Sequence, residues 1–243
     1  MLMALALSAT AVPAFAQHRP VQVWADVDAV TTRPEQEAQS YSASQTIFSE
    51  TATGTVNYPT LSNERGTAFS GGVLVFHGLG AGVRFSSAIK RQMTSTITLR
   101  LPNPVLFNLF STDTTQTPLN RKDSAVDVSA VYAIPLGTRF VGARVFAGRS
   151  RVEITQAAVQ HVTFAVAARA SIQGVTTQNV SGFAWGSHFG FDAEFFPLNN
   201  LGIGASVLAR HVEIPDQIEP FSGKAIALTP DRVVTSFGVR ARF

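Results

Sequence analysis

Ten charged residues stand at alternate positions within apolar segments of the chain, and the chemistry they suggest is ion pairing. Five are acids and five are arginines: Asp26, Asp28, Arg84, Asp127, Arg144, Asp192, Glu194, Arg210, Arg240 and Arg242. On strands with a two-residue period, these side chains point to the face opposite the apolar ones. Charges removed from water need partners. The equal numbers therefore predict a paired internal network that closes the interior, with a narrow or gated conduit as the alternative.

The other residue types that could support catalysis or bind a metal are poorly arranged. The histidines are His18, His77, His161, His188 and His211, and none of their spacings is typical of a metal site or a zinc protease. Ser187 and His188 are adjacent, so on a strand they point to opposite faces and cannot act together. The chain has no cysteine, which excludes thiolate metal sites and disulfides. We expect no catalytic residue, no metal site and no cofactor.

The segments that carry the ten charges have the period of β-strands. The clearest is 183–196, whose first face carries Phe183, Trp185, Ser187, Phe189, Phe191, Ala193 and Phe195. The opposite face carries Ala184, Gly186, His188, Gly190, Asp192, Glu194 and Phe196. The other alternating segments are 21–29, 68–76, 79–87, 125–134, 139–148, 201–210 and 233–243. Many aromatics opposite glycines and carboxylates are typical of a lipid-facing surface around a polar interior.

The connections between these eight segments alternate between short and long. The short ones are HGL at 77–79, PLGT at 135–138 and PLNN at 197–200. The long ones are 32–66, 91–122, 154–180 and 214–230. Membrane barrels have short periplasmic turns and long extracellular loops, whereas a soluble sandwich or lipocalin has no reason to sort its connections by end. We predict an all-β fold, an eight-stranded antiparallel transmembrane β-barrel of the outer membrane.

Two of the long connections carry features of their own. Residues 44–59 are rich in threonine and partly alternating, so we expect a strand or hairpin that extends above the membrane. Residues 94–110 end in an apolar stretch, which we expect to touch the lipid headgroups or to fold over the barrel mouth.

The N-terminal residues 1–16 are typical of a secretory signal peptide. They are apolar and end in Ala14-Phe15-Ala16, which predicts cleavage before Gln17. No lysine or arginine precedes the apolar run, as expected if translation starts further upstream. The mature chain is then a single barrel domain, 17–243. No later segment approaches the 18 consecutive apolar residues of a transmembrane helix.

The overall charge argues against nucleic acid as a partner. Charged residues make up only 14% of the chain and the net charge is +3, although the pI is about 9.7. The arginines are scattered singly, whereas nucleic-acid binding needs a basic patch that follows the phosphates.

The C-terminal segment ends on an aromatic residue after a regular alternation. Its apolar face ends with Phe237, Val239, Ala241 and Phe243. This pattern resembles the assembly signal of bacterial outer-membrane barrels, and the mature chain resembles the small eight-stranded family that includes OmpA-type and OmpW-type barrels. The resemblance implies that the barrel-assembly machinery binds the last strand. It also implies a place in the Gram-negative cell envelope.

The function expected from these observations is non-enzymatic. We predict an envelope structural or surface-interaction protein whose long loops contact an unidentified extracellular ligand, with a lumen closed by arginine and carboxylate pairs. The alternatives are a narrow channel for small or hydrophobic solutes and, less favoured, a lipid-modifying barrel enzyme. The expected partners are outer-membrane lipid and lipopolysaccharide, whose phosphates Arg149, Arg151 and Arg210 could bind near the outer rim.

Overall fold

The computed structural model describes residues 21–33, 36–61, 64–166 and 170–243. The predicted signal peptide, its cleavage site at Ala14, Ala16 and Gln17, and His18 lie outside these ranges. Within them, no helix is long and apolar enough to cross a membrane.

The described chain consists of β-strands and their connections. The strands are β1 (Gln22–Arg33), β2 (Gln39–Ile47), β3 (Glu50–Tyr58), β4 (Glu64–Phe76), β5 (Leu79–Pro102), β6 (Phe110–Ile134), β7 (Val141–Val166), β8 (Ala170–Phe195), β9 (Leu201–His211), β10 (Gln217–Ile218), β11 (Ala225–Ile226) and β12 (Val233–Arg242).

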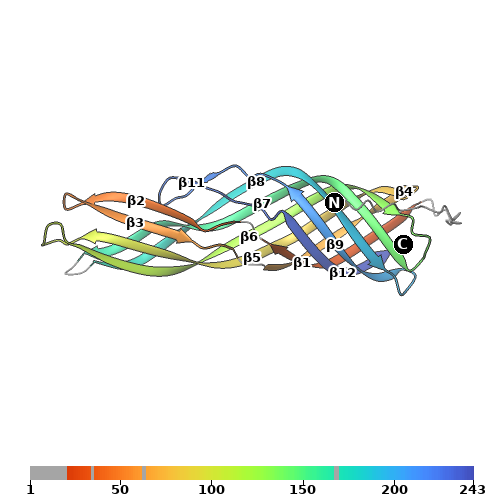
Figure 1. Ribbon diagram of the computed structural model, residues 1–243, viewed down its shortest axis with the longest axis horizontal. Coiled ribbons are helices and arrows are strands. Elements are labelled where there is room, and N and C mark those ends of the chain that lie inside the picture. Colours follow the sequence, from red (N-terminus) through yellow and green to blue (C-terminus); the bar gives the residue numbers. More distant parts are fainter. Residues whose placement is uncertain (1–20, 34–35, 62–63, 167–169) are drawn as a thin grey trace, which may run out of the picture.

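Eight of these strands close into an antiparallel barrel (Figure 1). The order around the ring is β1-β4-β5-β6-β7-β8-β9-β12, and β12 pairs with β1 to close it. Each of the eight alternating segments lies in one of these strands, in chain order. The predicted fold class, an eight-stranded antiparallel β-barrel, is confirmed.

The outward face of the barrel is an apolar band. Phe69, Phe85, Phe189 and Phe237 lie on four different strands and are 52%, 54%, 69% and 58% exposed. In β9 the outward residues from Leu201 to Ala209 are all apolar, a length that matches the 9–11 residues of a membrane-spanning strand. Such a wide apolar surface is unfavourable in water but suits a lipid environment.

Tight turns join the strands at one end of the barrel. Between β4 and β5 the turn is His77-Gly78, with φ angles of 47° and 82°, the left-handed backbone of a two-residue hairpin. The other turns at this end are 135–140 and 196–200. Phe243 and Val23 exchange two backbone hydrogen bonds, of 2.8 and 3.1 Å. The start of β1 and the end of β12 therefore lie at the same end as the short turns.

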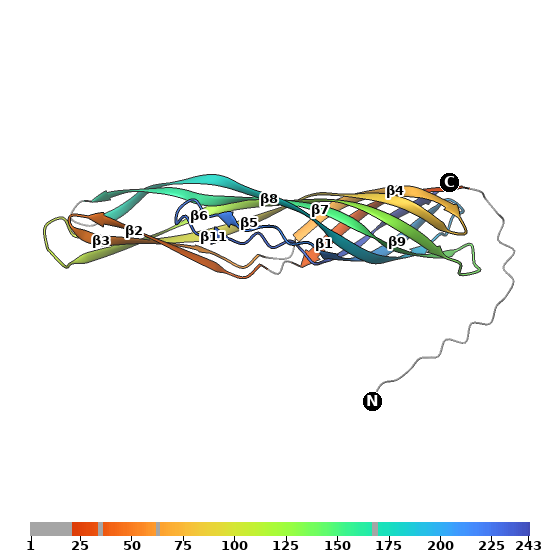
Figure 2. The same cartoon turned by 90° about the horizontal axis from the view of Figure 1, so that it is seen from above.

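At the other end, four of the barrel strands continue far beyond the apolar band. β5, β6, β7 and β8 are 24, 25, 26 and 26 residues long. With β2, β3 and the segment 212–232 they form an elongated body, here called the extension, which occupies the left half of Figures 1 and 2. Most of the long connections are therefore strands rather than loops. The hairpin expected within 44–59 is confirmed as β2 and β3.

A β-bulge in β5 reverses which side chains face inward. Between Ser86 and Ile89, β5 contributes one residue more than its partner β6. Before the bulge, even-numbered residues such as Arg84 are buried; beyond it, odd-numbered residues such as Ile97 and Leu99 are buried. A single alternating pattern cannot be followed across this point, which is why residues 94–102 appeared to belong to a loop.

The extension has an apolar core of its own, separate from the polar interior of the barrel. The core residues come from β2, β3, β5, β6, β7, β8 and the segment 212–232. Val56, Ile97, Ile154 and Ile226 are completely buried within it. The barrel has polar residues inside and apolar residues outside. The extension has apolar residues inside and polar residues outside, which is the arrangement of a water-exposed domain. We conclude that the extension projects into water.

Tyr58 ties the segment 212–232 to the sheet. Its hydroxyl donates to Glu219 Oε1 at 2.8 Å and accepts from the backbone N–H of Val159 at 3.0 Å. Glu219 is fully buried and also accepts two hydrogen bonds from Ser222, each of 2.7 Å. Burial raises the pKa of Tyr58, so its hydroxyl remains a donor in neutral solution.

Replacing Tyr58 by phenylalanine should loosen the segment around β10 and β11. A buried carboxylate then loses one partner, at a cost of about 1.5–3 kcal/mol. Hydrogen exchange at residues 217–226 should become faster, while exchange in β12 should not change. The matched control is Tyr132→Phe on the lipid-facing surface, where Tyr132 is 38% exposed. Equal exchange in both variants and the wild type would contradict this role.

Candidate functional site

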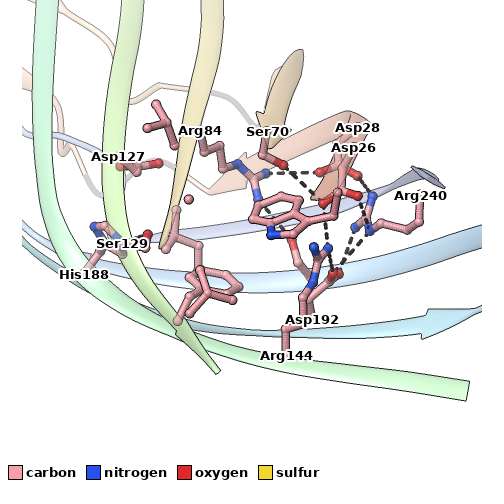
Figure 3. A pocket seen from close by; sticks show the side chains of 17 residues that line it. Asp26, Asp28, Ser70, Arg84, Asp127, Ser129, Arg144, His188, Asp192 and Arg240 are labelled. Carbon is pink, nitrogen blue, oxygen red and sulfur yellow. Dashed lines mark hydrogen bonds and ion pairs between the residues drawn. The ribbon is translucent and has the colours of Figure 1, made fainter. Parts of the chain in front are cut away.

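The centre of the barrel is organised around Arg240 of β12. Its guanidinium contacts Asp28 Oδ1 at 2.5 Å and Asp192 at 2.9 and 3.2 Å, and it lies 3.8 Å from Asp26. Figure 3 shows these carboxylates pointing toward it from β1 and β8. Arg240 is 1% exposed. A guanidinium with several carboxylates is a strong, directional group, and here it joins β1 and β8, which lie on either side of β12 in the ring.

Arg144 of β7 forms the second half of this cluster. Its Nη2 atom lies 2.6 Å from Asp26, 2.5 Å from Asp192 and 2.6 Å from Glu194. Its guanidinium also stacks on the ring of Trp24, 4.1 Å from the centroid. Asp26 and Asp192 thus each contact both arginines, so the cluster is one network rather than separate pairs.

A second cluster lies closer to the extension. Arg210 contacts Asp127 through two atoms, at 2.6 and 3.1 Å. Arg84 donates to Ser206 at 3.1 Å and lies 3.8 Å from Asp28, which links this cluster to the one around Arg240. Arg84 thus lies between Asp127 and the carboxylates around Arg240 (Figure 3).

His188 lies beside this second cluster and between two serines. Its Nε2 atom is 2.7 Å from Ser129 Oγ and its Nδ1 atom is 2.9 Å from Ser150 Oγ. Ser150 in turn donates to Asp127 at 2.6 Å. Sequence spacing points only to Ser187 as a partner of His188, and not to Ser129. Ser129 is paired with Gly148 across β6 and β7, and Gly148 is paired with His188 across β7 and β8. Only the strand register brings the pair together.

The space left among these charged residues is small. A cavity of about 40 Å³ is bounded by residues that include Trp24, Asp26, Ser129, His188 and Arg240. Such a volume holds a few water molecules at most. The serine–histidine contact thus has no room for an acyl or phosphoryl substrate beside it.

A further cluster of buried polar residues, Gln36, Arg121 and Asp123, separates the barrel interior from the apolar core of the extension and is here called the neck. Arg121 donates to Asp123 at 2.8 and 3.2 Å, to Gln36, and to the carbonyl of Thr229 at 2.7 Å. The sequence analysis missed Arg121 and Asp123, although both continue the inward parity of Asp127. The signal was hidden because Lys122 and Ser124 occupy the outward positions, where the strand leaves the apolar band.

Arg242 and Arg210 lie differently from the expectations for them. Arg242 is at the turn end, where it donates to the carbonyls of Asn199 at 3.0 Å and Arg139 at 2.5 Å and stacks on Phe196. It therefore holds the turns at this end and lines the same vestibule as Arg144 and Glu194. Arg210 is 9% exposed and faces Asp127, so the expectation that it reaches lipopolysaccharide at the rim is wrong.

The remaining predicted positions lie as follows. Phe237, Val239 and Phe243 of the C-terminal pattern are exposed on the outward face, at 58%, 48% and 61%, and Ala241 is partly exposed. Their role in assembly stays a prediction. Among the described residues, no group of three or more histidine, aspartate or glutamate side chains is arranged to hold a metal ion.

Comparisons with known proteins add only a general likeness. No family model matches the chain, and no curated protein matches it. Among solved structures, Ail, the attachment invasion locus protein of Yersinia pestis, in complex with the heparin analogue sucrose octasulfate, is 13% identical, with 91% of this chain and 99% of that chain covered and a TM-score of 0.40.

Two further solved structures are similar at the same level. Neisserial surface protein A is 13% identical, with 92% and 97% of the chains covered and a TM-score of 0.38. The N-terminal β-barrel domain of Pseudomonas aeruginosa OprF is 9% identical, with 92% and 98% covered and a TM-score of 0.30. The chain has the small eight-stranded barrel fold that the resemblance implied. That conclusion depends on its own strand pairings, since these likenesses are too distant to support an argument about function.

Replacing Arg240 by methionine should destabilise the barrel strongly. Asp28 and Asp192 would then be left buried with fewer partners, and breaking a buried pair costs about 3–5 kcal/mol. The measurement is the temperature at which the folded band disappears on an unheated gel, together with urea unfolding in micelles. Arg242→Met is the matched control and should cost less, because its guanidinium bonds to carbonyls at the rim. Equal losses in the two variants would contradict the central role of Arg240.

Proposed function

We propose that this chain is a non-enzymatic outer-membrane protein of the bacterial envelope, with a closed barrel, that uses the extension as its contact surface outside the cell. The observation that carries the proposal is the extension itself. It is a long, separately cored body on the end of the barrel opposite the short turns. A protein that served only as a membrane plug would gain nothing from these long, ordered strands.

The membrane location is supported by the outward surface of the barrel. Its apolar band is one membrane-spanning strand in height, and the strand pairing leaves no free edge within it. The turn end holds both the beginning of β1 and Phe243, which suits a barrel inserted from the periplasm. We therefore assign the short turns to the periplasm and the extension to the outside. In this orientation the barrel-assembly machinery would bind the strand that ends at Phe243 during biogenesis.

Closure of the lumen is supported by three successive layers. The ion-paired layer around Arg240 and Arg144 fills the barrel, the neck around Arg121 lies above it, and the apolar core of the extension lies above the neck. An eight-stranded barrel has room for little more than its own side chains. A vestibule of about 790 Å³ opens at the turn end but has Arg144 and Glu194 among its lining residues, so it leads into the ion-paired layer.

The same packing disfavours an enzyme. Ser129 and His188 are in contact, but the cavity beside them is about 40 Å³. We therefore assign these groups to packing of the interior.

Lipopolysaccharide is the partner proposed for the outer rim. Arg149 is exposed on the outward face of β7, and Arg151 lies two residues further toward the extension, 3.5 Å from Glu153. Guanidinium groups at this height suit the phosphates of the outer leaflet. Unchanged retention of lipopolysaccharide by an Arg149→Ser/Arg151→Ser protein would contradict this assignment. The charge distribution offers no comparable surface for nucleic acid.

The orientation can be tested with single cysteines, because the natural chain has none. Thr112 lies near the far end of the extension and Thr138 lies in the β6–β7 turn, and both are exposed. In intact cells, a membrane-impermeant maleimide should label Thr112→Cys, and it should label Thr138→Cys only after lysis. Labelling of both positions in intact cells, or of Thr138→Cys alone, would refute the proposed arrangement.

The closed lumen can be tested by conductance. Purified protein in planar bilayers should give no discrete current steps, under conditions in which a general porin prepared in the same detergent does. Arg121→Ser removes part of the neck but leaves the ion-paired layer, so it should also give none. Reproducible steps from the wild type would favour the narrow channel, and a changed step size in Arg121→Ser would place the conduit through the neck.

A further inference from the structure

The far end of the extension carries exposed apolar side chains from two hairpins. Phe48 belongs to the β2–β3 turn; Val105, Leu106, Phe107 and Leu109 belong to the β5–β6 connection. They are 55%, 83%, 56%, 74% and 48% exposed, in that order. These five residues are here called the apolar tip, and they lie at the left end of the molecule in Figure 1. The two turns are joined by a hydrogen bond of 2.6 Å from the Asn108 N–H to Glu50.

The apolar tip is far from the membrane that holds the barrel. β5 leaves the apolar band near Ser86 and ends at Pro102. At about 3.3 Å per residue, these roughly 16 residues correspond to about 50 Å of strand. The expectation that this apolar stretch touches the headgroups or covers the barrel mouth is therefore wrong. Whatever the tip contacts must lie outside the cell.

Most backbone N–H groups of the β5–β6 part of the tip donate hydrogen bonds within it. Asn103 Oδ1 accepts from the N–H groups of Val105 and Leu106, at 2.8 and 2.9 Å. Asn103 donates to the carbonyl of Leu109 at 2.7 Å, and Leu109 donates to that of Leu106 at 3.3 Å. Prolines at 102 and 104 have no N–H to satisfy. A segment in which most N–H groups are bonded enters an apolar medium at a lower cost than one with many unbonded donors.

The turn that presents Phe48 is unfavourable for that residue. Phe48 and Ser49 have φ angles of 50° and 66°, the left-handed conformation that two-residue hairpin turns normally fill with asparagine and glycine. A bulky aromatic residue there is an outlier. Its side chain is mostly exposed, so packing does not account for it. Strained positions of this kind cluster at functional sites.

The apolar tip also lacks charge. No charged residue occurs between 101 and 112. Arg100 at its base stacks on the ring of Phe110 at 3.8 Å, and Glu50 is buried. A neutral, convex, aromatic surface is suited to the interfacial region of a bilayer, which accepts apolar and aromatic side chains and needs no matching charge.

We propose that the apolar tip inserts into the outer layer of a lipid bilayer held against the bacterial surface, such as the membrane of another cell. This inference depends on the orientation in the proposed function, and it names the partner class for the extension. A protein partner fits less well, because stable protein interfaces bury about 800 Å² on each side with polar groups at the rim. The apolar tip has five side chains, too few for such an area, and its polar backbone groups are largely bonded within the tip rather than available at a rim.

The test uses the full chain in nanodiscs mixed with phosphatidylcholine vesicles. Wild-type nanodiscs should float with the vesicles in a density gradient, and Leu106→Ser/Phe107→Ser should lower the bound fraction at least tenfold. Ile218→Ser is the matched control. Ile218 is 71% exposed, and its neighbour Gln217 lies near Gly182, well below the tip. This control should bind as the wild type does. An unchanged heat-modifiable gel shift in all variants would show that the fold is kept.

The other outcomes each overturn the inference. Wild-type nanodiscs that do not float refute it without affecting the proposed function, provided that Thr112→Cys is labelled on intact cells. Equal binding by the tip variant places the contact elsewhere on the protein. Binding to cell membranes that is lost after protease treatment of those membranes indicates a protein partner. Self-association of the purified chain in detergent, where no bilayer is present, indicates contact between two copies of the chain.

Discussion

The burial of paired charges inside a closed ring of eight strands is the constraint on which the rest of the barrel depends. Arg240 and Arg144 share Asp26 and Asp192, so each arginine is held by carboxylates from different strands. Such a network is stable only if each strand presents the correct residue at the correct height, because a shift of one residue would turn the charge toward lipid. Close packing is part of the same constraint. A side chain at Gly204 would come within 2.7 Å of the Arg240 guanidinium.

The molecule places its strands in two different solvents. In the barrel, the outward face meets lipid and the inward face is polar. In the extension, the outward face carries threonine and other polar residues and the inward face is apolar. The bulge after Ser86 makes this change possible in β5, because it moves the inward position from even to odd residues. The neck, with Arg121 and Asp123, lies where the two arrangements meet. There, buried polar groups bond to one another instead of to water.

This division also separates the two roles that we propose, a closed barrel in the membrane and a contact surface on the extension. Ion pairs lie inside the barrel and an apolar core lies inside the extension. In the function we propose, this packing gives rigidity rather than passage. The rigid strands then carry the hairpin turns about 50 Å from the apolar band, given roughly 3.3 Å per residue. Function on this reading belongs to the far end of the extension, where exposed apolar side chains are held by hydrogen bonds such as that between Asn108 and Glu50.

The sequence by itself determined the number of barrel strands, the faces of these strands and the gathering of the short turns at one end. Alternation in a lipid-facing strand is unusually clear, because most of its outward residues are apolar. It also identified nine of the residues that form the ion-paired layer, because charges on an otherwise apolar strand can only face inward. Only the tertiary structure decided which charges meet. Pairs such as Asp28 and Arg240, or Ser129 and His188, depend on register and on closure of the ring. The tertiary structure alone also revealed the extension. Strands with threonines on the outward face look like loops in the sequence, and the bulge interrupts the alternation by which β5 could have been followed.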